Sequence, residues 1–155
     1  MQWAEVVADP SLRDLPFKIE LNQWGLIEMS PASTWHFGLQ GRVVRYINRK
    51  LLDGESGGEV PIMTTLGVRV PDAAWRSEAH IRKHAYESPF SVAPELCIEV
   101  RSESNTNAEF EAKTAAYLAA GAHEVWWVEI DARVRVFNAA GEVASSALVD
   151  ELPVI

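Results

Sequence analysis

Residues 94–117 read PELCIEVRSESNTNAEFEAKTAAY, and they predict a strand, a short polar turn and a helix in succession. Along the strand the side chains alternate with a period of two, so they separate into an apolar face and a more polar face. The apolar face holds Leu96, Ile98 and Val100, and the other face holds Glu95, Cys97, Glu99 and Arg101. Because a carboxylate is costly inside an otherwise apolar strand, Glu99 must pair with a cation or coordinate one.

The helix that follows has signals at both of its ends. Residues 106–109, TNAE, fit a capping box, and Gly121 stands where a glycine commonly follows a helix. Lys113 lies three residues after Phe110 and four before Tyr117, on the face expected to pack inward. The strand and the helix therefore each direct a charged side chain, of opposite sign, towards the interior.

The composition is that of an ordinary globular protein. The chain has 155 residues, of which 48% are hydrophobic and 23% charged, and this suits one domain, residues 1–155, with a single core. Its one cysteine, Cys97, excludes an internal disulfide and a cysteine-rich metal site, and its place within a strand predicts a buried apolar role. No run approaches the roughly 18 apolar residues that span a membrane. No secretory leader opens the chain, so we expect a reducing, cytoplasmic location without membrane attachment.

The charge balance bears on nucleic acid as a partner. A formal net charge of −8 and a pI near 5.0 count against strong autonomous binding to DNA. They do not exclude it, because metal ions offset clustered carboxylates and a basic face can coexist with net negative charge. Arg42, Arg45 and Arg49 form such a basic stripe, for which we expect a solvated face, with phosphate contact as the alternative.

The first third of the chain predicts a hairpin and a helix. Strands at residues 17–22 and 26–29 flank a turn in which Gly25 can take a positive φ. A helix is expected from a cap at residues 33–34 to about Leu52. Its buried face is expected to consist of Trp35, Leu39, Val43, Tyr46, Ile47 and Leu51.

The remaining segments complete an α/β pattern. Residues 53–58 are predicted as a flexible polar loop, and residues 60–65 as at most an edge element containing a proline. Residues 67–70 alternate and are predicted as a strand, and residues 73–75 continue an extended path. A short helix is expected within residues 76–88. Strands follow at residues 123–130 and 134–138, with a closing hairpin through residues 139–141. This order predicts one α/β domain with a central mixed sheet flanked by helices.

Four acidic residues fall at structured positions: Glu28, Asp72, Glu95 and Glu99. If the strands that carry Asp72 and Glu99 are neighbours, both carboxylates can share a hard divalent ion such as Mg²⁺, which prefers oxygen ligands. Lys113 would then position the attacking water or balance charge on a scissile phosphate. Each residue also has a plainer alternative: Asp72 in a solvated turn, Glu99 paired with Arg101, and Lys113 with its ammonium in water.

Several blocks of sequence stand in an order that is typical of one nuclease family. They are FKIEL at residues 17–21, GLIEMSP at 25–31 followed by His36, GVRVPD at 67–72, PELCIEV at 94–100, and EAKTAAY at 111–117 followed by Gly121 and EVWWV at 124–128. The series, from about residue 17 to residue 138, resembles the Uma-two family of restriction endonucleases, which are compact members of the PD-(D/E)XK nuclease superfamily. No single block is specific, but their order is.

The resemblance implies a restriction-endonuclease-like α/β fold with a Mg²⁺ site, Mn²⁺ being the alternative ion. Asp72 and Glu99 would be the metal-binding carboxylates, with the Val100 carbonyl as an additional ligand. Lys113 would be the catalytic lysine, displaced from the strand onto the helix. Accessory positions near the site would be those of Glu28, His36 and Arg101.

Arg101 marks a departure from the family. Where relatives have Glu-Val-Leu-Ser-Pro-Ser, this chain has Glu-Val-Arg-Ser-Glu-Ser at residues 99–104. Arg101 occupies the position two after the acid, where the wider superfamily keeps its lysine. A guanidinium stays protonated and cannot act as a base, so Arg101 would either assist Lys113 or neutralise Glu99 and weaken metal binding.

Three functions follow as hypotheses. The first is a Mg²⁺-dependent endonuclease that hydrolyses DNA phosphodiester bonds. By analogy with nuclease domains of this size it would act as a homodimer, for which Trp126, Trp127 and the terminal hairpins offer apolar surface. The alternative is a catalytically impaired protein of this fold that serves as a binding or assembly module, as the net charge and Arg101 suggest. The third is a metal-dependent hydrolase of a small phosphate ester.

Overall fold

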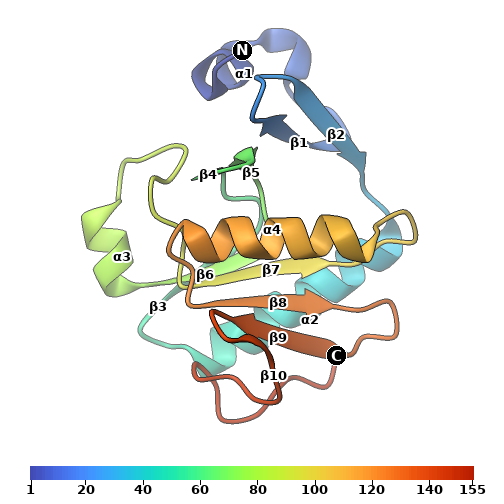
Figure 1. The fold of residues 1–155 in the computed structure, drawn as a ribbon, viewed down its shortest axis with the longest axis vertical. Helices are drawn as coiled ribbons and strands as arrows, with labels where there is room; N and C mark the ends of the chain where they lie inside the picture. The colour runs from blue at the N-terminus through green and yellow to red at the C-terminus, as the bar shows by residue number, and fades with distance from the viewer.

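The computed structural model describes residues 1–155 and arranges the strands in two sheets (Figure 1). The strands of the larger sheet are β3 (Gly54–Gly57), β6 (Ala73–Ser77), β7 (Leu96–Val100), β8 (Glu124–Val128), β9 (Val134–Asn138) and β10 (Gly141–Val143). Those of the smaller sheet are β1 (Phe17–Asn22), β2 (Ile27–Pro31), β4 (Ile62–Thr64) and β5 (Gly67–Arg69). The helices are α1 (Trp3–Ala8), a 3₁₀ turn at Pro10–Leu12, α2 (Thr34–Lys50), α3 (Glu78–Lys83) and α4 (Asn107–Ala119). None of the helices combines the length and apolar content that crossing a bilayer requires.

The larger sheet is mixed, as the sequence predicts. Its strand order is β10-β9-β8-β7-β6-β3, and the β7–β8 pair is parallel whereas the other neighbours are antiparallel. Parallel neighbours need a crossover connection, and α4 supplies it between β7 and β8. The smaller sheet, in the order β2-β1-β5-β4, is antiparallel throughout.

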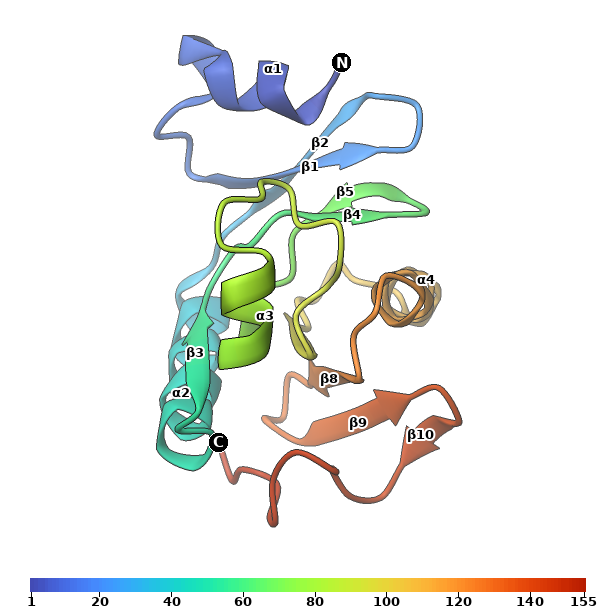
Figure 2. The same cartoon turned by 90° about the vertical axis from the view of Figure 1, so that its left-hand side faces the viewer.

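Helices α2 and α4 cover opposite faces of the larger sheet (Figure 2). The α2 side buries Leu39, Val43 and Ile47 of the helix against the apolar face of β7, which holds Leu96, Ile98 and Val100. The α4 side buries Phe110 and Tyr117 against Cys97, Val125 and Trp127. The predicted alternation along residues 94–100 is therefore confirmed, and so is the buried free Cys97.

The helix ends also form as predicted. Ser33 caps α2 by accepting a hydrogen bond from the His36 amide. Both halves of the capping box between Thr106 and Glu109 are present at the start of α4. Gly121 takes a φ of 112° just beyond α4, in the left-handed region that favours glycine.

Three expectations, about residues 53–58, Trp35 and the pair Trp126 and Trp127, are wrong. Residues 53–58 contain a strand, because β3 pairs along its whole length with β6 and leaves no free loop. Trp35 is exposed although it lies in register with the buried residues of α2, because it stands in the first turn, ahead of Leu39, where the helix begins to contribute to the core. Trp126 and Trp127 are buried, so neither offers apolar surface for a second copy.

The sequence predicts the strands of the smaller sheet, including the β1–β2 hairpin, but it does not predict their assembly into a separate sheet. Its apolar face, with Leu21 and Val68, packs on Val6 of α1 and forms a separate small core. In Figures 1 and 2 this sheet and α1 form the upper part of the molecule, above α4 and the larger sheet. The other face of the small sheet looks towards the larger sheet and is polar, as described below.

The edge strand β3 generates a stability prediction. A Cβ atom on Gly54 would lie 2.2 Å from the Arg76 carbonyl oxygen and 2.9 Å from the Trp75 ring, whereas one on Gly57 would meet nothing within 4 Å. Gly54→Ala should therefore lower the free energy of unfolding by about 2 kcal/mol, because the strand must move away from β6. Gly57→Ala, the control in the same strand, should change it by less than about 0.5 kcal/mol. Urea denaturation measures both, and equal effects would contradict the close approach at Gly54.

Candidate active site

Asp72 and Glu99 lie opposite each other at the ends of two neighbouring strands. The antiparallel β6–β7 register pairs Ala73 with Ile98. Asp72, just before Ala73, therefore stands across from Glu99, just after Ile98. Both are almost fully buried, at 3% and 2% exposure. The Val100 amide donates a hydrogen bond of 2.7 Å to Asp72 Oδ2 and so links the two strand ends. The expectation that these two acids are neighbours is confirmed, and a solvated Asp72 is excluded.

Lys18 of β1 supplies the cation between these two carboxylates. Its Nζ lies 2.7 Å from Asp72 Oδ1 and 3.5 Å from Glu99 Oε2. The period of two along β1 places Lys18 and Glu20 on one face and Ile19 and Leu21 on the other, where they pack in the small core. The polar face of the small sheet therefore closes over the carboxylates of the larger sheet.

Lys113 of α4 holds the other side of Glu99. Its Nζ lies 3.3 Å from Glu99 Oε1 and 3.0 Å from the nearer oxygen of Glu20. The Tyr117 hydroxyl, one turn further along the helix, donates a hydrogen bond of 2.8 Å to the same Glu99 oxygen. The inward orientation of Lys113 is confirmed, and its ammonium has two acidic partners instead of solvent.

Glu20 and Glu28 extend the charged cluster along the small sheet. These two residues are cross-strand partners on β1 and β2. Arg69 of β5 pairs with both of them, and the Val70 amide donates a hydrogen bond of 2.8 Å to Glu20. Glu28, an accessory candidate, therefore reaches the site through Arg69 and lines its cavity without contacting Asp72 or Glu99.

The first turns of α2 close the site on the side of Asp72. His36 places its Nε2 3.1 Å from Asp72 Oδ2, which confirms that this accessory candidate lies at the site. Gln40, one turn along the helix, donates a hydrogen bond to the Asp72 carbonyl oxygen. Because Ser33 fixes where α2 starts, the helix cap also determines where the backbone of His36 and Gln40 lies.

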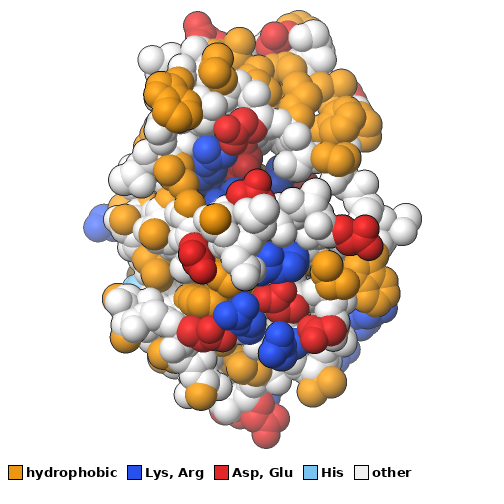
Figure 3. Space-filling model, turned by 45° about the vertical axis from the view of Figure 1, so that its right-hand side comes forward, with side chains coloured by type: hydrophobic (Ala, Val, Ile, Leu, Met, Phe, Trp, Pro, Cys, Tyr) orange, Lys and Arg blue, Asp and Glu red, His pale blue; other side chains and the backbone are white.

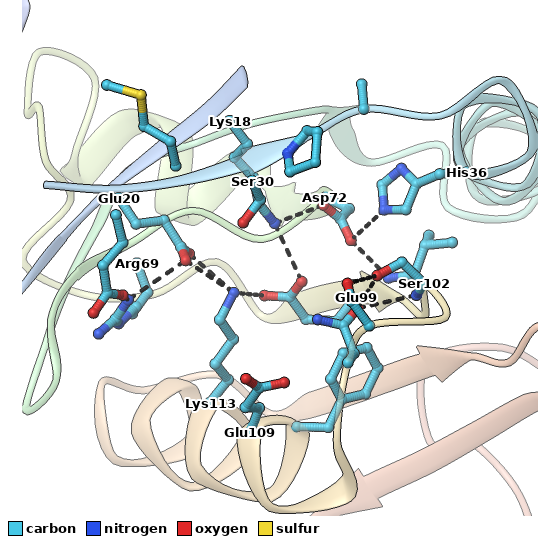
Figure 4. A pocket seen from close by; sticks show the side chains of 18 of the residues that line it. Lys18, Glu20, Ser30, His36, Arg69, Asp72, Glu99, Ser102, Glu109 and Lys113 are labelled. Carbon is cyan, nitrogen blue, oxygen red and sulfur yellow. Dashed lines mark hydrogen bonds and ion pairs between the residues drawn. The ribbon is translucent and has the colours of Figure 1, made fainter. Parts of the chain in front are cut away.

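Together these residues form a row in which acidic and basic groups alternate (Figure 4). In order along the row they are His36, Asp72, Lys18, Glu99, Lys113, Glu20, Arg69 and Glu28. Each of the three buried carboxylates thus contacts two basic groups. Such alternation offsets the desolvation that makes buried charge costly.

The two central acids respond differently to this environment. Burial raises the pKa of Asp72, but the charge of Lys18 and the hydrogen bond from His36 outweigh it, so the pKa lies well below its usual value. Burial also raises the pKa of Glu99, and there Lys113 and Lys18 do not offset it fully, because Asp72 and Glu20 are close. Glu99 is therefore the carboxylate whose charge this structure favours least.

The row forms the floor of an open cavity of about 600 Å³. Its rim includes Met29 and Pro31 of β2 and Ser102, Ser104 and Asn105 of the turn before α4. Figure 3 shows the charged side chains of this face in mixed groups of both signs, with a red and blue group in the hollow below the upper part of the molecule. The cavity is wide enough for an extended polar ligand, and its floor carries the titratable groups.

Arg101 and Glu95 lie apart from this row. Arg101 pairs with Glu129, with its Nε 2.5 Å from the carboxylate, and its guanidinium stacks over the Phe110 ring. The alternative in which Arg101 pairs with Glu99 is therefore wrong, because the strand ends at Val100 and the next side chain turns towards Glu129, between β8 and β9. Glu95 accepts hydrogen bonds from Ser77 at the start of α3.

Sequence reasoning missed four members of the site: Lys18, Glu20, Arg69 and Gln40. A signal for the first two exists in β1, where two charged residues alternate with apolar ones and so must share a face. Nothing local marks Arg69 or Gln40, because their partners lie 32 to 49 residues away in the sequence.

The donor set matches a hard divalent cation in chemistry. Asp72 Oδ1 and Glu99 Oε2 both face a single cation, and two carboxylates at one position are typical of Mg²⁺ sites that retain water. Here the Lys18 ammonium occupies that position. No group of three or more His, Cys, Asp or Glu side chains is arranged to hold a metal ion. The residues therefore fit Mg²⁺ provided that Lys18 leaves the position.

The fold is that of a known α/β class. It matches the crystal structure of a "putative nuclease" from Anabaena variabilis with a TM-score of 0.76, over 98% of this chain and 93% of the other, at 18% sequence identity. No curated protein has a matching sequence. The model of the Uma-two (Uma2) family, described as "Putative restriction endonuclease", matches residues 10–152. The chain therefore belongs to this nuclease family.

The row of charges generates a prediction about stability without metal. Asp72→Asn should lower the free energy of unfolding by about 3 kcal/mol, because it removes one partner of a buried ion pair. Glu99→Gln should lower it by less than about 1 kcal/mol, because burial raises the pKa of Glu99 and its charge therefore contributes less to the stability of the fold. Urea denaturation at pH 7 in metal-free buffer measures both. Equal losses would show that Glu99 is not the less favoured charge.

His36 generates a prediction about pH. The hydrogen bond to Asp72 raises the pKa of His36, against the opposing effect of burial. A histidine with a raised pKa stabilises the fold fully below its unfolded pKa of about 6.5, and this stabilisation is lost as the pH rises through the folded pKa. The difference in Tm between the wild type and His36→Gln, in metal-free buffer, should therefore be larger at pH 6 than at pH 9. A difference that is constant or grows with pH would contradict this assignment.

Proposed function

We propose that the protein is a Mg²⁺-dependent endonuclease that hydrolyses phosphodiester bonds in DNA, with Mn²⁺ as an alternative ion. The observation that carries the proposal is the convergence of Asp72 and Glu99 on one cation position, beside Lys113, in the floor of an open cavity. Membership of a family described as restriction endonucleases supports phosphodiester hydrolysis as the reaction at this site.

Asp72 and Glu99 would hold the ion, and the Val100 carbonyl is proposed as a further ligand. Mg²⁺ would supply Lewis-acid stabilisation of the charge that develops on the phosphate. The hydrogen bond from the Val100 amide to Asp72 keeps the backbone beside both acids fixed, which limits the reorganisation needed when a ligand binds.

Lys113 would orient the attacking water and balance charge on the phosphate. Its ammonium is held by Glu99 and Glu20, so it points into the cavity without depending on substrate. The Tyr117 hydroxyl fixes the orientation of Glu99, which keeps this carboxylate directed at both lysines. The chain thus positions its groups before substrate arrives, which is a main source of catalytic rate.

DNA as the substrate finds support on the exposed side of α2. Arg42, Arg45 and Arg49 are exposed and make no ion pair in the structure, so they are available to phosphates. The N-terminal end of the same helix brings His36 and Gln40 to the cavity. The three arginines would supply the local positive charge that an otherwise acidic protein needs to bind the phosphates of a duplex independently of sequence.

A plasmid-nicking assay tests the proposal. The wild type should relax supercoiled DNA with Mg²⁺ or Mn²⁺ and lose this activity in EDTA. Asp72→Asn and Lys113→Met should each reduce the rate by about 100-fold or more, because each removes a group that acts on the phosphate or its cation. Lys50→Met, a matched change in an exposed lysine that pairs with Asp150, should retain the rate. Cleavage that survives both site substitutions would remove this site assignment.

A second function is supported by the balance of charges in the row. Lys18, Lys113 and Arg69 already neutralise most of the acidic charge without any metal, which suits a binding or assembly module that does not cut. Arg101 no longer supports this alternative, because it pairs with Glu129. A protein that binds DNA in EDTA but neither binds millimolar metal nor nicks plasmid would have this second function.

We also propose a homodimer, since a nuclease with one site needs a second copy to cut both strands at once. Because Trp126 and Trp127 are buried, the exposed aromatic residues Trp24, Trp35 and Phe37 are the candidates for its interface. Light scattering after size-exclusion chromatography would show the mass directly.

A further inference from the structure

Lys18 occupies the two carboxylate oxygens that a metal ion would need. On Asp72, Oδ2 is taken by the Val100 amide and by His36, and Oδ1 faces Lys18. On Glu99, Oε1 is taken by Tyr117 and by Lys113, and Oε2 faces Lys18. The oxygens that remain for a cation are therefore the pair already facing the Lys18 ammonium.

An ammonium and a divalent ion cannot share this position. Mg²⁺ holds its oxygen ligands at about 2.1 Å, closer than either contact of Lys18 Nζ, so both carboxylates must move closer to the ion or reach it through water. A retained ammonium would then lie beside a doubly charged ion in a buried site, and like charges repel strongly where the dielectric constant is low. Metal binding and the present position of Lys18 exclude each other.

The side chain of Lys18 can move from this position into the cavity. It lines the cavity and is 14% exposed, and its partners belong to the other sheet. Four rotatable methylene groups let the ammonium swing into the cavity while β1 stays paired with β2 and β5. Leaving the position therefore requires no change in the backbone of either sheet.

We propose that Lys18 is the resident counter-cation of the Asp72–Glu99 pair, and that a divalent ion must displace it to bind. The ammonium keeps the two acids neutralised and correctly placed in the metal-free protein. It also raises the concentration of metal that the site requires, so Lys18 acts as a positioning residue that sets metal affinity. This inference rests on the metal site of the proposed function.

Calorimetric titration with MnCl₂ in metal-free buffer tests it, with Lys18→Met and Lys18→Arg compared with the wild type. Lys18→Met keeps the length of the side chain but removes the competing charge, so it should bind Mn²⁺ at least about tenfold more tightly, as expected when one buried like charge is removed. Lys18→Arg keeps the charge and should bind no more tightly than the wild type. Lys50→Met, whose lysine pairs with exposed Asp150, should bind as the wild type does.

The outcomes separate the inference from the function on which it rests. Equal or weaker Mn²⁺ binding by Lys18→Met, with clear binding by the wild type, would overturn the counter-cation role and leave the metal site intact. An absence of binding by every variant at millimolar Mn²⁺ would overturn the metal site itself and the inference with it. Tighter binding by both Lys18→Met and Lys18→Arg would also overturn the role, since the charge would then not be what competes.

A measurement on the wild type avoids dependence on the folding of a variant. The chain has four lysines, so the ammonium signals of lysine labelled with ¹³C and ¹⁵N can be assigned one by one. The chemical shifts of Lys18 Cε and Nζ, read through the carbon-bound protons, should change as Mg²⁺ saturates the site and the ammonium leaves its two carboxylates, while those of the exposed Lys50 stay unchanged. Lys18 chemical shifts that stay unchanged at saturating Mg²⁺ would overturn the displacement.

Discussion

The structure depends on placing Asp72 and Glu99 side by side in the interior. Two buried carboxylates repel each other, and each loses the hydration that it has in the unfolded chain. A larger sheet covered by two helices cannot solve this problem alone, because its own elements supply only Lys113 and His36. The small sheet supplies Lys18, and with it the charge that lets both acids remain in place.

This requirement explains why the two sheets meet through charged groups and not through an apolar core. Each sheet has its own hydrophobic packing, on α2 and α4 for the larger one and on α1 for the smaller one. Between them runs the row of alternating charges that ends at Glu28. Ion pairs between elements distant in sequence are sensitive to geometry, so the row also specifies how the small sheet docks.

In this arrangement Glu99 is the residue whose negative charge is least favoured. Asp72 is well satisfied, whereas the pKa of Glu99 is raised by burial and by its acidic neighbours. A carboxylate whose charge is disfavoured can gain free energy from a cation of higher charge, which is what the proposed metal ion would supply. Under the proposed displacement, the disfavoured charge of Glu99 would favour binding of a divalent ion, and the Lys18 ammonium would oppose it.

The sequence by itself determined the local units of this protein. Alternation along residues 94–100 and the capping box at residues 106–109 depend on near neighbours, and both form as predicted. Periodicity also sufficed to direct Glu99 and Lys113 inward, and the order of motifs brought in Asp72 as their partner. These inferences succeed because a strand or a helix has a fixed period wherever it is placed.

Only the tertiary structure decided which charges meet. The GESG segment became a strand through pairing with β6, and Arg101 turned to Glu129 although its distance from Glu99 in sequence suggested otherwise. Lys18 reaches Asp72 across 54 residues and Glu99 across 81, because the small sheet docks over both acids. Local patterns predict the strands of that sheet but not where it docks. Sequence periodicity states which face a side chain occupies, but the partner of a buried charge is set by how separate sheets dock, and that depends on the whole chain.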